Sequence, residues 1–314
     1  MSGVVTLGET MGLLSNAEPG PLQHAGSLRL SIGGSESNTA IGLARLGVEV
    51  TWFGRVGSDA LGEMVLREIR GEGVRVLAAR DTEAPTGLML KERRSTMDTR
   101  VSYYRSGGAG VRLSAADLDL EVVRGADLLH VTGISLALSE RCAGAVHTAV
   151  SAAREAGVPV SFDLNFRSKL WSRQAARQAY RSMIPLCDIV IAGDDEAGVV
   201  LGAGQAPEEL ARGLAELSRG EAVVKLGARG AVACSGDQIY RQPVVPVTVV
   251  DTVGAGDGFV AGYLAEYLAG EPVPARLRTA ATVGAYACTV TGDWEGLPRR
   301  DELAALTATE PVSR

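Results

Sequence analysis

The chain has 314 residues, of which 46% are hydrophobic and 22% charged, so it can bury a substantial core and is too apolar to be disordered. Its formal net charge is -6, and it contains no block of lysines and arginines. Contacts to nucleic acids or anionic membranes need clustered positive charge, so neither is expected as a partner. Small molecules or further subunits are expected instead.

The first residues, MSGVVTLGET, show no basic region followed by an apolar stretch, and no segment approaches the length of a membrane span. A cytoplasmic location is therefore expected. The three histidines and four cysteines are widely separated, without the spacing of zinc ligands, so no transition-metal site is predicted. A hard cation held by carboxylates stays possible.

Short apolar strands alternate with helical stretches along most of the chain. Helices are predicted from a cap at Ser37 to Gly47, at 141–156, at 174–183 and from 274 to about 290. This alternation is typical of a parallel sheet covered by helices on both faces, so we expect a three-layer α/β fold. The predicted strands lie at 4–8, 50–54, 128–133, 158–165, 188–193 and 222–227.

Two segments, 11–32 and 86–105, break this alternation. The second alternates apolar and polar residues around a polar turn, which predicts a hairpin. Both are expected to form a small β-sheet lid, which leaves residues 1–10, 33–85 and 106–314 as the main α/β domain. Because an open sheet edge invites pairing, we expect a homo-oligomer formed through the lid.

A glycine-rich loop, DTVGAGDGF at 251–259, follows a predicted β-branched strand and precedes an apolar helix. Backbone amides and the positive end of the helix dipole can face an anion at such a place, as in a phosphate cradle. The loop is not a Walker A motif, because the GK[ST] ending is missing. It is also not the dinucleotide-binding motif, whose glycine spacing differs.

Asp257 is the acidic residue of this loop, and the loop alone leaves two interpretations open. Asp257 could accept the proton of an acceptor hydroxyl while the neighbouring amides stabilise the transferring charge. It could instead cap the helix, as Asp often does. In the first case the amides and the helix dipole should favour the ionised carboxylate, which would make it a weak base that mainly orients the hydroxyl.

The loop resembles a signature of the ribokinase-like (PfkB) carbohydrate kinases, and SIGGSESNTAIGLARLG at 31–47 with GRVGSDALG at 54–62 resembles the second signature region of that family. The resemblance covers nearly the whole chain. It implies a ribokinase-like fold with a β-lid, ATP and Mg²⁺ as cofactors, and phosphoryl transfer to a sugar hydroxyl. By resemblance, Asp257 is the catalytic base, and the anion hole consists of Gly254, Ala255 and Gly256.

The same resemblance implies the nucleotide site. The family places adenine and ribose near the string KLGARG at 225–230, which taken alone is a turn between two strands. Mg²⁺ is held in the family by an Asn-x-x-Glu motif, of which residues 193–196 keep only Glu196, expected to act through water. Acidic residues at 194–196 would also suit the first turn of a helix. The implied nucleotide-binding residues are Asn165, Lys225, Gly227, Gly230, Gly254 and Gly256.

Three segments resemble the 2-keto-3-deoxygluconate kinase branch of the family: DLNFRSKLW at 163–171, SYYR at 102–105 and TGDWEG at 291–296. Such a substrate carries a carboxylate, which the guanidinium fork of arginine binds at two points. Each residue also has a simpler structural explanation, and Met89 stands where the branch has a tyrosine. The implied substrate-binding residues are Arg105, Arg167, Tyr103, Tyr104, Gly33, Gly34 and Asp293.

Three alternatives remain. A kinase of the same family for fructose, ribose or another keto sugar would leave Arg105 and Arg167 without a carboxylate to bind. A nicotinamide-dependent oxidoreductase shares the α/β pattern, although Gly8-Glu9-Thr10 stands where its glycine motif should follow the first strand. A non-catalytic sugar or nucleotide sensor is the third, and the presence of Asp257 argues against it.

Overall fold

The computed structural model describes residues 3–95 and 98–307. Its main feature is a nine-stranded sheet in the order β13-β12-β11-β10-β9-β8-β1-β4-β5, in which the strands from β11 to β5 are parallel and β12 and β13 antiparallel. The strands are β1 (Val4–Leu7), β4 (Val50–Gly57), β5 (Arg75–Asp81), β8 (Leu128–Thr132), β9 (Val160–Asp163), β10 (Ile189–Gly193), β11 (Glu221–Lys225), β12 (Ala231–Ser235) and β13 (Gln238–Gln242).

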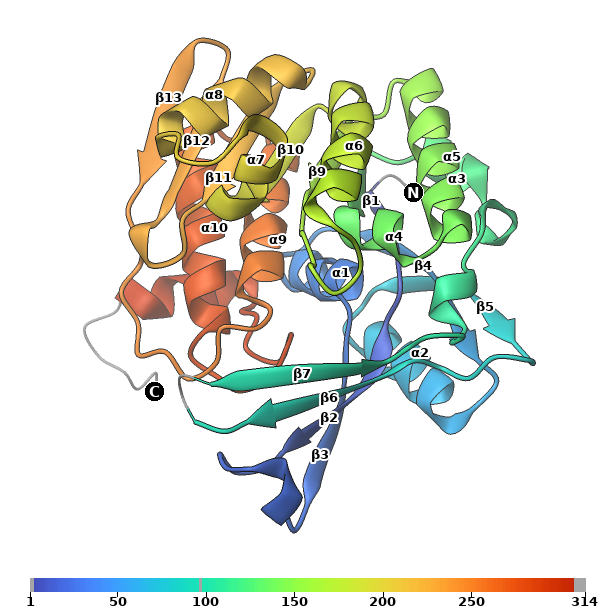
Figure 1. Ribbon diagram of the computed structural model, residues 1–314. Helices are drawn as coiled ribbons and strands as arrows, with labels where there is room; N and C mark the ends of the chain where they lie inside the picture. Colours follow the sequence, from blue (N-terminus) through green and yellow to red (C-terminus); the bar gives the residue numbers. More distant parts are fainter. Residues whose placement is uncertain (1–2, 96–97, 308–314) are drawn as a thin grey trace.

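Helices cover both faces of this sheet (Figure 1). Successive strand residues point to opposite faces, and in β10 Val190 packs in one hydrophobic cluster whereas Ile189 and Ile191 pack in the other. The first cluster includes α3 (Leu120–Arg124), α4 (Gly133–Leu138), α5 (Glu140–Ala156), α6 (Arg173–Met183), α7 (Asp194–Leu201) and α8 (Pro207–Leu217). The second includes α1 (Ser35–Arg45), α2 (Ala60–Gly71), α9 (Ala255–Leu268) and α10 (Val273–Ala287).

A second sheet of four strands lies beside the main body (Figure 1). Its order is β3 (Leu28–Gly33), β2 (Met11–Asn16), β6 (Leu88–Arg93) and β7 (Thr99–Tyr104). One face carries a small buried cluster of Met11, Leu13 and Met89. Leu28, Leu30 and Tyr104 are exposed on this sheet.

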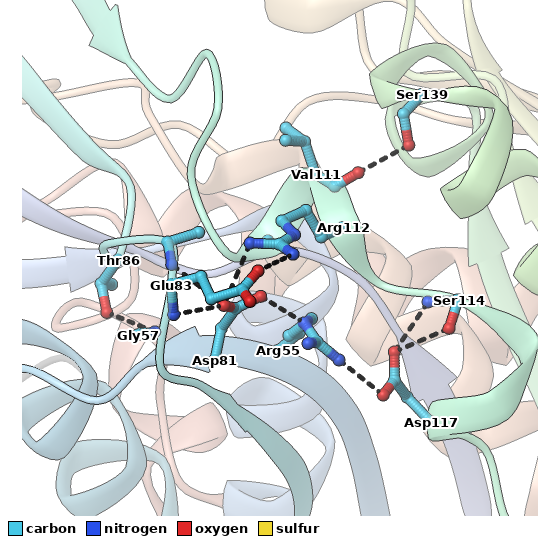
Figure 2. A network of polar contacts seen from close by, with 12 residues as sticks. Arg55, Gly57, Asp81, Glu83, Thr86, Val111, Arg112, Ser114, Asp117 and Ser139 are labelled. Carbon is cyan, nitrogen blue, oxygen red and sulfur yellow. Dashed lines mark hydrogen bonds and ion pairs between the residues drawn. The ribbon is translucent and has the colours of Figure 1, made fainter.

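The segment that leads from β5 into this sheet is fixed by a polar network around Asp81 (Figure 2). The Asp81 carboxylate accepts hydrogen bonds from Arg55 Nε at 2.9 Å, from the amides of Glu83 and Ala84 at 2.9 Å each, and from Arg112 at 3.1 Å. Burial acts to raise the pKa of Asp81, but these donors outweigh it and hold the pKa at about 2.

The predicted fold class is confirmed: the sheet is largely parallel, helices lie on both faces, and a small second sheet is present. Its strands fall in the segments expected to form the lid, except that β3 extends to Gly33. The division into two units at the expected boundaries stays a prediction. Among the described residues, no helix combines the length and apolar character that crossing a bilayer requires.

Two local predictions are wrong. Helix α1 begins at Ser35 with Gly34 as its N-cap, and the Ser37 hydroxyl donates to the Gly34 carbonyl at 3.0 Å from inside the helix. The strand expected directly before the glycine loop ends at Gln242, and residues 243–249 belong to no strand. This segment contains Pro243 and Pro246, which cannot donate a backbone hydrogen bond.

Candidate active site

A cavity of about 920 Å³ opens between the carboxyl ends of the parallel strands and the second sheet. Parallel α/β sheets generally bind ligands at this edge. The cavity is lined by the N-terminus of α1, the loop after β9, the end of β11 and the glycine loop, and on the other side by strands β6 and β7. Residues far apart in the sequence therefore meet here.

Asp257 lies in the first turn of α9, and its carboxylate lines the cavity. Ser35 Oγ donates to Asp257 Oδ1 at 2.7 Å, and Asn38 Nδ2 donates to Oδ2 at 2.8 Å. The N-cap of α9 is Gly254, and no side chain caps the helix. The alternative that Asp257 is a helix cap is therefore wrong, because both oxygens are bound by α1.

Burial raises the pKa of Asp257 to about 7, against the lowering effects of the Ser35 and Asn38 hydrogen bonds and of the Arg167 charge. The expectation that the helix dipole would keep Asp257 a weak base is thus wrong. Desolvation outweighs the favourable donors, because an ionised carboxylate loses more water than two neutral donors replace. A carboxyl group that titrates near neutral pH is suited to general base catalysis.

Asn165 extends the hydrogen-bond chain behind Asp257. Its side-chain amide donates to Ser35 Oγ at 2.7 Å. Asn165 has a φ of 40° and is the one residue other than glycine with a positive φ in the described ranges. Such strain is maintained where the surrounding structure fixes it, often at functional sites. Asn165 therefore positions Ser35, and its expected contact with the nucleotide stays a prediction.

Gly254 is required at its position in the loop for two reasons. Its φ is 78°, in the left-handed region that favours glycine, and an added Cβ would lie 1.8 Å from the Asp293 carbonyl oxygen. The loop is thus packed against the backbone of the segment near residue 293. The Ala255 amide donates to the Thr252 carbonyl at 3.4 Å. The first amides of a helix have no partner within it and can face an anion, and the anion hole expected of Ala255 and Gly256 stays a prediction.

Lys225 brings a positive charge to this loop. Its Nζ lies 3.7 Å from the point where a Cβ on Gly256 would stand, and it donates to Asp163 Oδ2 at 2.8 Å. Burial acts to lower the pKa of Lys225, but the carboxylates of Asp163 and Glu196 outweigh it and raise the pKa. Lys225 is therefore a permanent cation beside the predicted anion hole.

Glu196, the predicted Mg²⁺ ligand, uses both oxygens within the protein. Oε1 accepts from the Phe166 amide at 3.0 Å and Oε2 from the Gly193 amide at 2.7 Å. Burial raises its pKa. Asp163 Oδ1 is buried without a protein partner and lines the same cavity. Among the described residues no three acidic, histidine or cysteine side chains form a metal cluster.

These carboxylates nevertheless fit Mg²⁺, which prefers oxygen ligands and keeps most of its water. Asp163 and Glu196 are the residues that would hold such an ion, through water molecules.

Of the three predicted residues at the end of β7 and directly after it, two reach the cavity and one does not. Tyr103 and Arg105 line the cavity, whereas Tyr104 is 63% exposed and does not. Neighbouring strand residues point to opposite faces, so Tyr103 and Tyr104 cannot both face the substrate. The prediction for Tyr104 is therefore wrong.

The two predicted carboxylate ligands differ in their partners. Arg105 forms an ion pair with Glu9, a buried residue that follows β1. Arg167 lines the cavity with an exposed side chain, and no carboxylate in the described ranges forms an ion pair with it. Its guanidinium is therefore the one better placed to take a ligand carboxylate.

Gly33 and Asp293 lie close together. An added Cβ on Gly33 would stand 2.2 Å from Met89 Cε and 2.6 Å from Asp293 Oδ2, so the glycine allows close packing there. Gly34 and Asp293 line the cavity directly, but Gly33 does not. Burial raises the pKa of Asp293, and Lys91 acts against this.

A model described as pfkB family carbohydrate kinase matches residues 1–300 of the chain. The chain belongs to this family. It is 35% identical over 311 residues to a 2-dehydro-3-deoxygluconokinase of Bacillus subtilis, covering 98% of this chain and 95% of the relative. It is also 35% identical over 292 residues to a 2-dehydro-3-deoxygalactonokinase of Haloferax volcanii, covering 92% of each.

Among solved structures, this pfkB carbohydrate kinase resembles a putative ribokinase II of E. coli in complex with ATP and Mg²⁺. The TM-score is 0.90 at 26% identity, over 98% of this chain and 99% of the other. The family and fold expected from the sequence are confirmed. The nicotinamide-dependent alternative is wrong.

In this carbohydrate kinase, Gly227 and Gly230 flank the short turn after β11, with φ of 57° and 89°. Neither lines the cavity. Their geometry accounts for both glycines as turn formers, and their contact with adenine stays a prediction.

Sequence reasoning missed several cavity residues of this pfkB kinase. Asp163 could have been found, since it ends a predicted strand at the ligand-binding edge. The buried Glu36, whose Oε1 accepts from Thr132 and Ser135 at 2.7 and 2.6 Å, gave no such signal. The missed residues that line the cavity include Glu9, Ser35, Glu36, Asn38, Asp163 and Lys169.

Proposed function

We propose that this kinase transfers the γ-phosphoryl group of ATP to a hydroxyl of an acidic keto sugar, with 2-keto-3-deoxygluconate converted to its 6-phosphate. The observation that carries the proposal is the Asp257 carboxyl group. Ser35 and Asn38 hold it in the cavity, with a pKa of about 7, in the first turn of the helix that begins at the glycine loop.

In the proposed mechanism, Asp257 accepts the proton of the sugar hydroxyl as that oxygen attacks the γ-phosphorus. The amides of Gly254, Ala255 and Gly256 stabilise the charge on the transferring phosphoryl oxygens. Lys225 adds a cation on the same side, since its Nζ stands beside Gly256. As the bond from the sugar oxygen to the γ-phosphorus forms, the bond from the γ-phosphorus to the β,γ-bridging oxygen breaks, so ADP leaves and the proton of the sugar hydroxyl stays on Asp257.

When bound, Mg²⁺ would supply positive charge that offsets the charge of the phosphates. In this chain Glu196 and Asp163 are the residues that would hold its water shell. The proposal is consistent with the E. coli relative whose structure contains ATP and Mg²⁺. It requires a compartment that contains ATP, and we therefore place the protein in the cytoplasm.

Arg167 is the proposed ligand of the sugar carboxylate, because its guanidinium lines the cavity and the described residues offer it no ion pair. Arg105 is already paired with Glu9, so it would present its remaining N–H groups to the substrate. Tyr103, Gly34 and Asp293 complete the proposed sugar site. The names of the Bacillus and Haloferax relatives support a 2-dehydro-3-deoxy sugar acid.

A coupled ATP assay tests the substrate. The panel should include 2-keto-3-deoxygluconate, its galactonate isomer, fructose and ribose, each over the same concentration range. We expect kcat/KM for one of the two acids to exceed that for both neutral sugars by at least about 100-fold, the value of one charge-assisted two-point contact. Activity on neutral sugars alone would refute the proposed acidic substrate and favour a fructose or ribose kinase of the same family.

We also propose that the second sheet, residues 11–32 and 86–105, acts as a lid and joins two copies of the chain. Leu28, Leu30 and Tyr104 are 43%, 51% and 63% exposed on it, which is unusual for large apolar side chains on one small sheet. Light scattering should give a mass that is a multiple of 32.6 kDa. A mass equal to the monomer would contradict this proposal.

A further inference from the structure

Lys91 is a buried lysine that the family signatures do not assign. It lies on β6 of the second sheet, and its side chain is 2% exposed. Its ammonium group leaves its own sheet and donates to Asp251 Oδ2 at 2.7 Å and to Asp293 Oδ1 at 3.1 Å. The side chains of these two aspartates are 4% and 7% exposed, so all three charges are removed from water.

Both aspartates belong to the segments that shape the glycine loop. Asp251 Oδ1 accepts from the Val253 amide at 3.2 Å, which forms the turn directly before Gly254. The carbonyl oxygen of Asp293 is the atom against which Gly254 packs. Lys91 therefore connects the two segments on either side of Gly254, and it does so from the opposite sheet.

The charge of Lys91 is as important as its position. The carboxylates of Asp251, three residues before Gly254, and of Asp293, whose backbone packs against Gly254, lie near a loop whose proposed task is to stabilise a negative phosphoryl group. A buried carboxylate without a counter-charge is costly and would repel the transferring charge. Glu295 stands close to Asp293 and adds to the negative charge, since it acts to raise the Asp293 pKa.

We propose that Lys91 is a positioning residue for phosphoryl transfer, whose ammonium neutralises Asp251 and Asp293 and thereby fixes the glycine loop when the second sheet is in place. The inference rests on the proposed role of that loop as the anion hole. The proposal connects the two halves of the site. The second sheet, which lies over the proposed sugar site, also supplies the Lys91 charge that holds the glycine loop in place.

The test uses the full chain and the matched pair Lys91→Met and Arg93→Met. Arg93 is two residues further along the same buried face of β6, and it donates to the Thr291 hydroxyl at 2.7 Å. We expect Lys91→Met to lower kcat by about 10- to 100-fold, less than the loss of a direct oxyanion donor costs, with the sugar KM changed much less. Arg93→Met should stay within about twofold of the wild-type kcat.

Lys91→Ala gives a second readout, because it leaves space for a small cation between two carboxylates. Ammonium chloride should restore kcat of this variant several-fold, whereas tetramethylammonium chloride at the same ionic strength should not, and the wild type should respond to neither. If the Lys91 variants do not fold, Asp251→Asn keeps the Lys91–Asp293 pair balanced but loses the ionic contact that holds the turn before Gly254, so it should lower kcat several-fold, and an unchanged kcat would overturn the proposal.

A folded Lys91→Met enzyme with near-normal kcat, an equal loss in Arg93→Met, or no response of Lys91→Ala to ammonium would each overturn the proposal. The outcome is separate from that of the proposed function. Any sugar that the panel identifies serves as substrate, and an active Asp257→Asn variant would refute the base while leaving the Lys91 comparison intact.

Discussion

Asp81 is buried and Asp257 is half-buried, and the protein shifts the pKa values of these two aspartates in opposite directions. At the end of β5, Asp81 accepts from two backbone amides and two guanidinium groups, and its pKa is about 2 (Figure 2). In the cavity, Asp257 accepts from one hydroxyl and one amide, and its pKa is about 7. Burial acts to raise both pKa values; at Asp81 the two amides and two guanidinium groups outweigh it, whereas at Asp257 the two neutral donors do not. Asp81 is therefore held ionised, and Asp257 titrates near neutral pH, as its proposed role as a base requires.

Among the variants that test this comparison, Asp257→Asn is expected to have the largest effect on activity. Removal of the proposed base should lower kcat by about 10³-fold or more while ATP affinity is retained. In the wild type, kcat/KM should rise with pH through about 7, since only the ionised form accepts a proton. Steady-state kinetics measure kcat and the pH dependence of kcat/KM, and calorimetric titration measures the ATP affinity. Near-normal turnover of Asp257→Asn would refute the role of Asp257 as the base.

Arg167→Met should have the next largest effect. Loss of one charge-assisted contact is expected to lower kcat/KM for the acidic sugar by about 10- to 100-fold, with little change for a neutral sugar. Arg173→Met is the matched control, because Arg173 lies close by in sequence but does not line the cavity. Equal losses on acidic and neutral sugars would contradict a contact with the carboxylate. Arg105→Met is a poorer test, because it leaves Glu9 buried without its ion pair.

Asp81→Asn should affect stability and leave kcat unchanged. We expect the free energy of unfolding to fall by about 2 kcal/mol at pH 7, since the variant breaks a buried hydrogen-bonded network. The folded pKa lies below the ordinary value of 3.8, so the stabilisation is present above pH 4 and is lost as the pH falls through about 2. Denaturant titration at pH 7 and pH 3 measures this, and a difference that persists unchanged at low pH would contradict it.

The smallest effect is a gain of stability at Asp257, in contrast to the loss expected at Asp81. Its folded pKa is raised, so its ionisation costs stability as the pH increases from about 4 through about 7. Asp257→Asn should therefore be more stable than the wild type at pH 8, by about 1–3 kcal/mol, and equal to it near pH 4. Asn38 Oδ1 has no partner, so its amide can reverse and accept from the new side chain. If Asp257→Asn were less stable than the wild type at pH 8, the ionised carboxylate would not be destabilised by desolvation in the folded protein.

The sequence predicted the fold well because its signals are local. Strand and helix periodicity, the hairpin at 86–105 and the glycine loop each depend on residues a few positions apart. The same locality explains the errors at Ser37 and Tyr104. Whether Ser37 caps a helix depends on the residue at which the helix begins. Whether a tyrosine in a strand points toward the cavity depends on which of the alternating positions it occupies, and the residue type fixes neither.

The site was less predictable because its contacts cross the whole chain. Ser35 and Asp257 are 222 residues apart, and Lys91 and Asp251 are 160 apart. No spacing rule joins such residues, so the partner of Arg105 and the support of the glycine loop came only from the structure. The raised pKa of Asp257 was missed for the same reason: burial depends on what covers the helix, not on the helix itself.

The proton on Asp257 also affects the enzyme while it waits for a sugar. With a pKa of about 7, the Asp257 carboxyl group changes its charge near neutral pH in the empty cavity. A water molecule that enters the cavity beside ATP can give its proton only to the ionised form. For the proposed role of Asp257, hydrolysis of ATP without sugar should therefore rise with pH over the same range as the transfer to sugar.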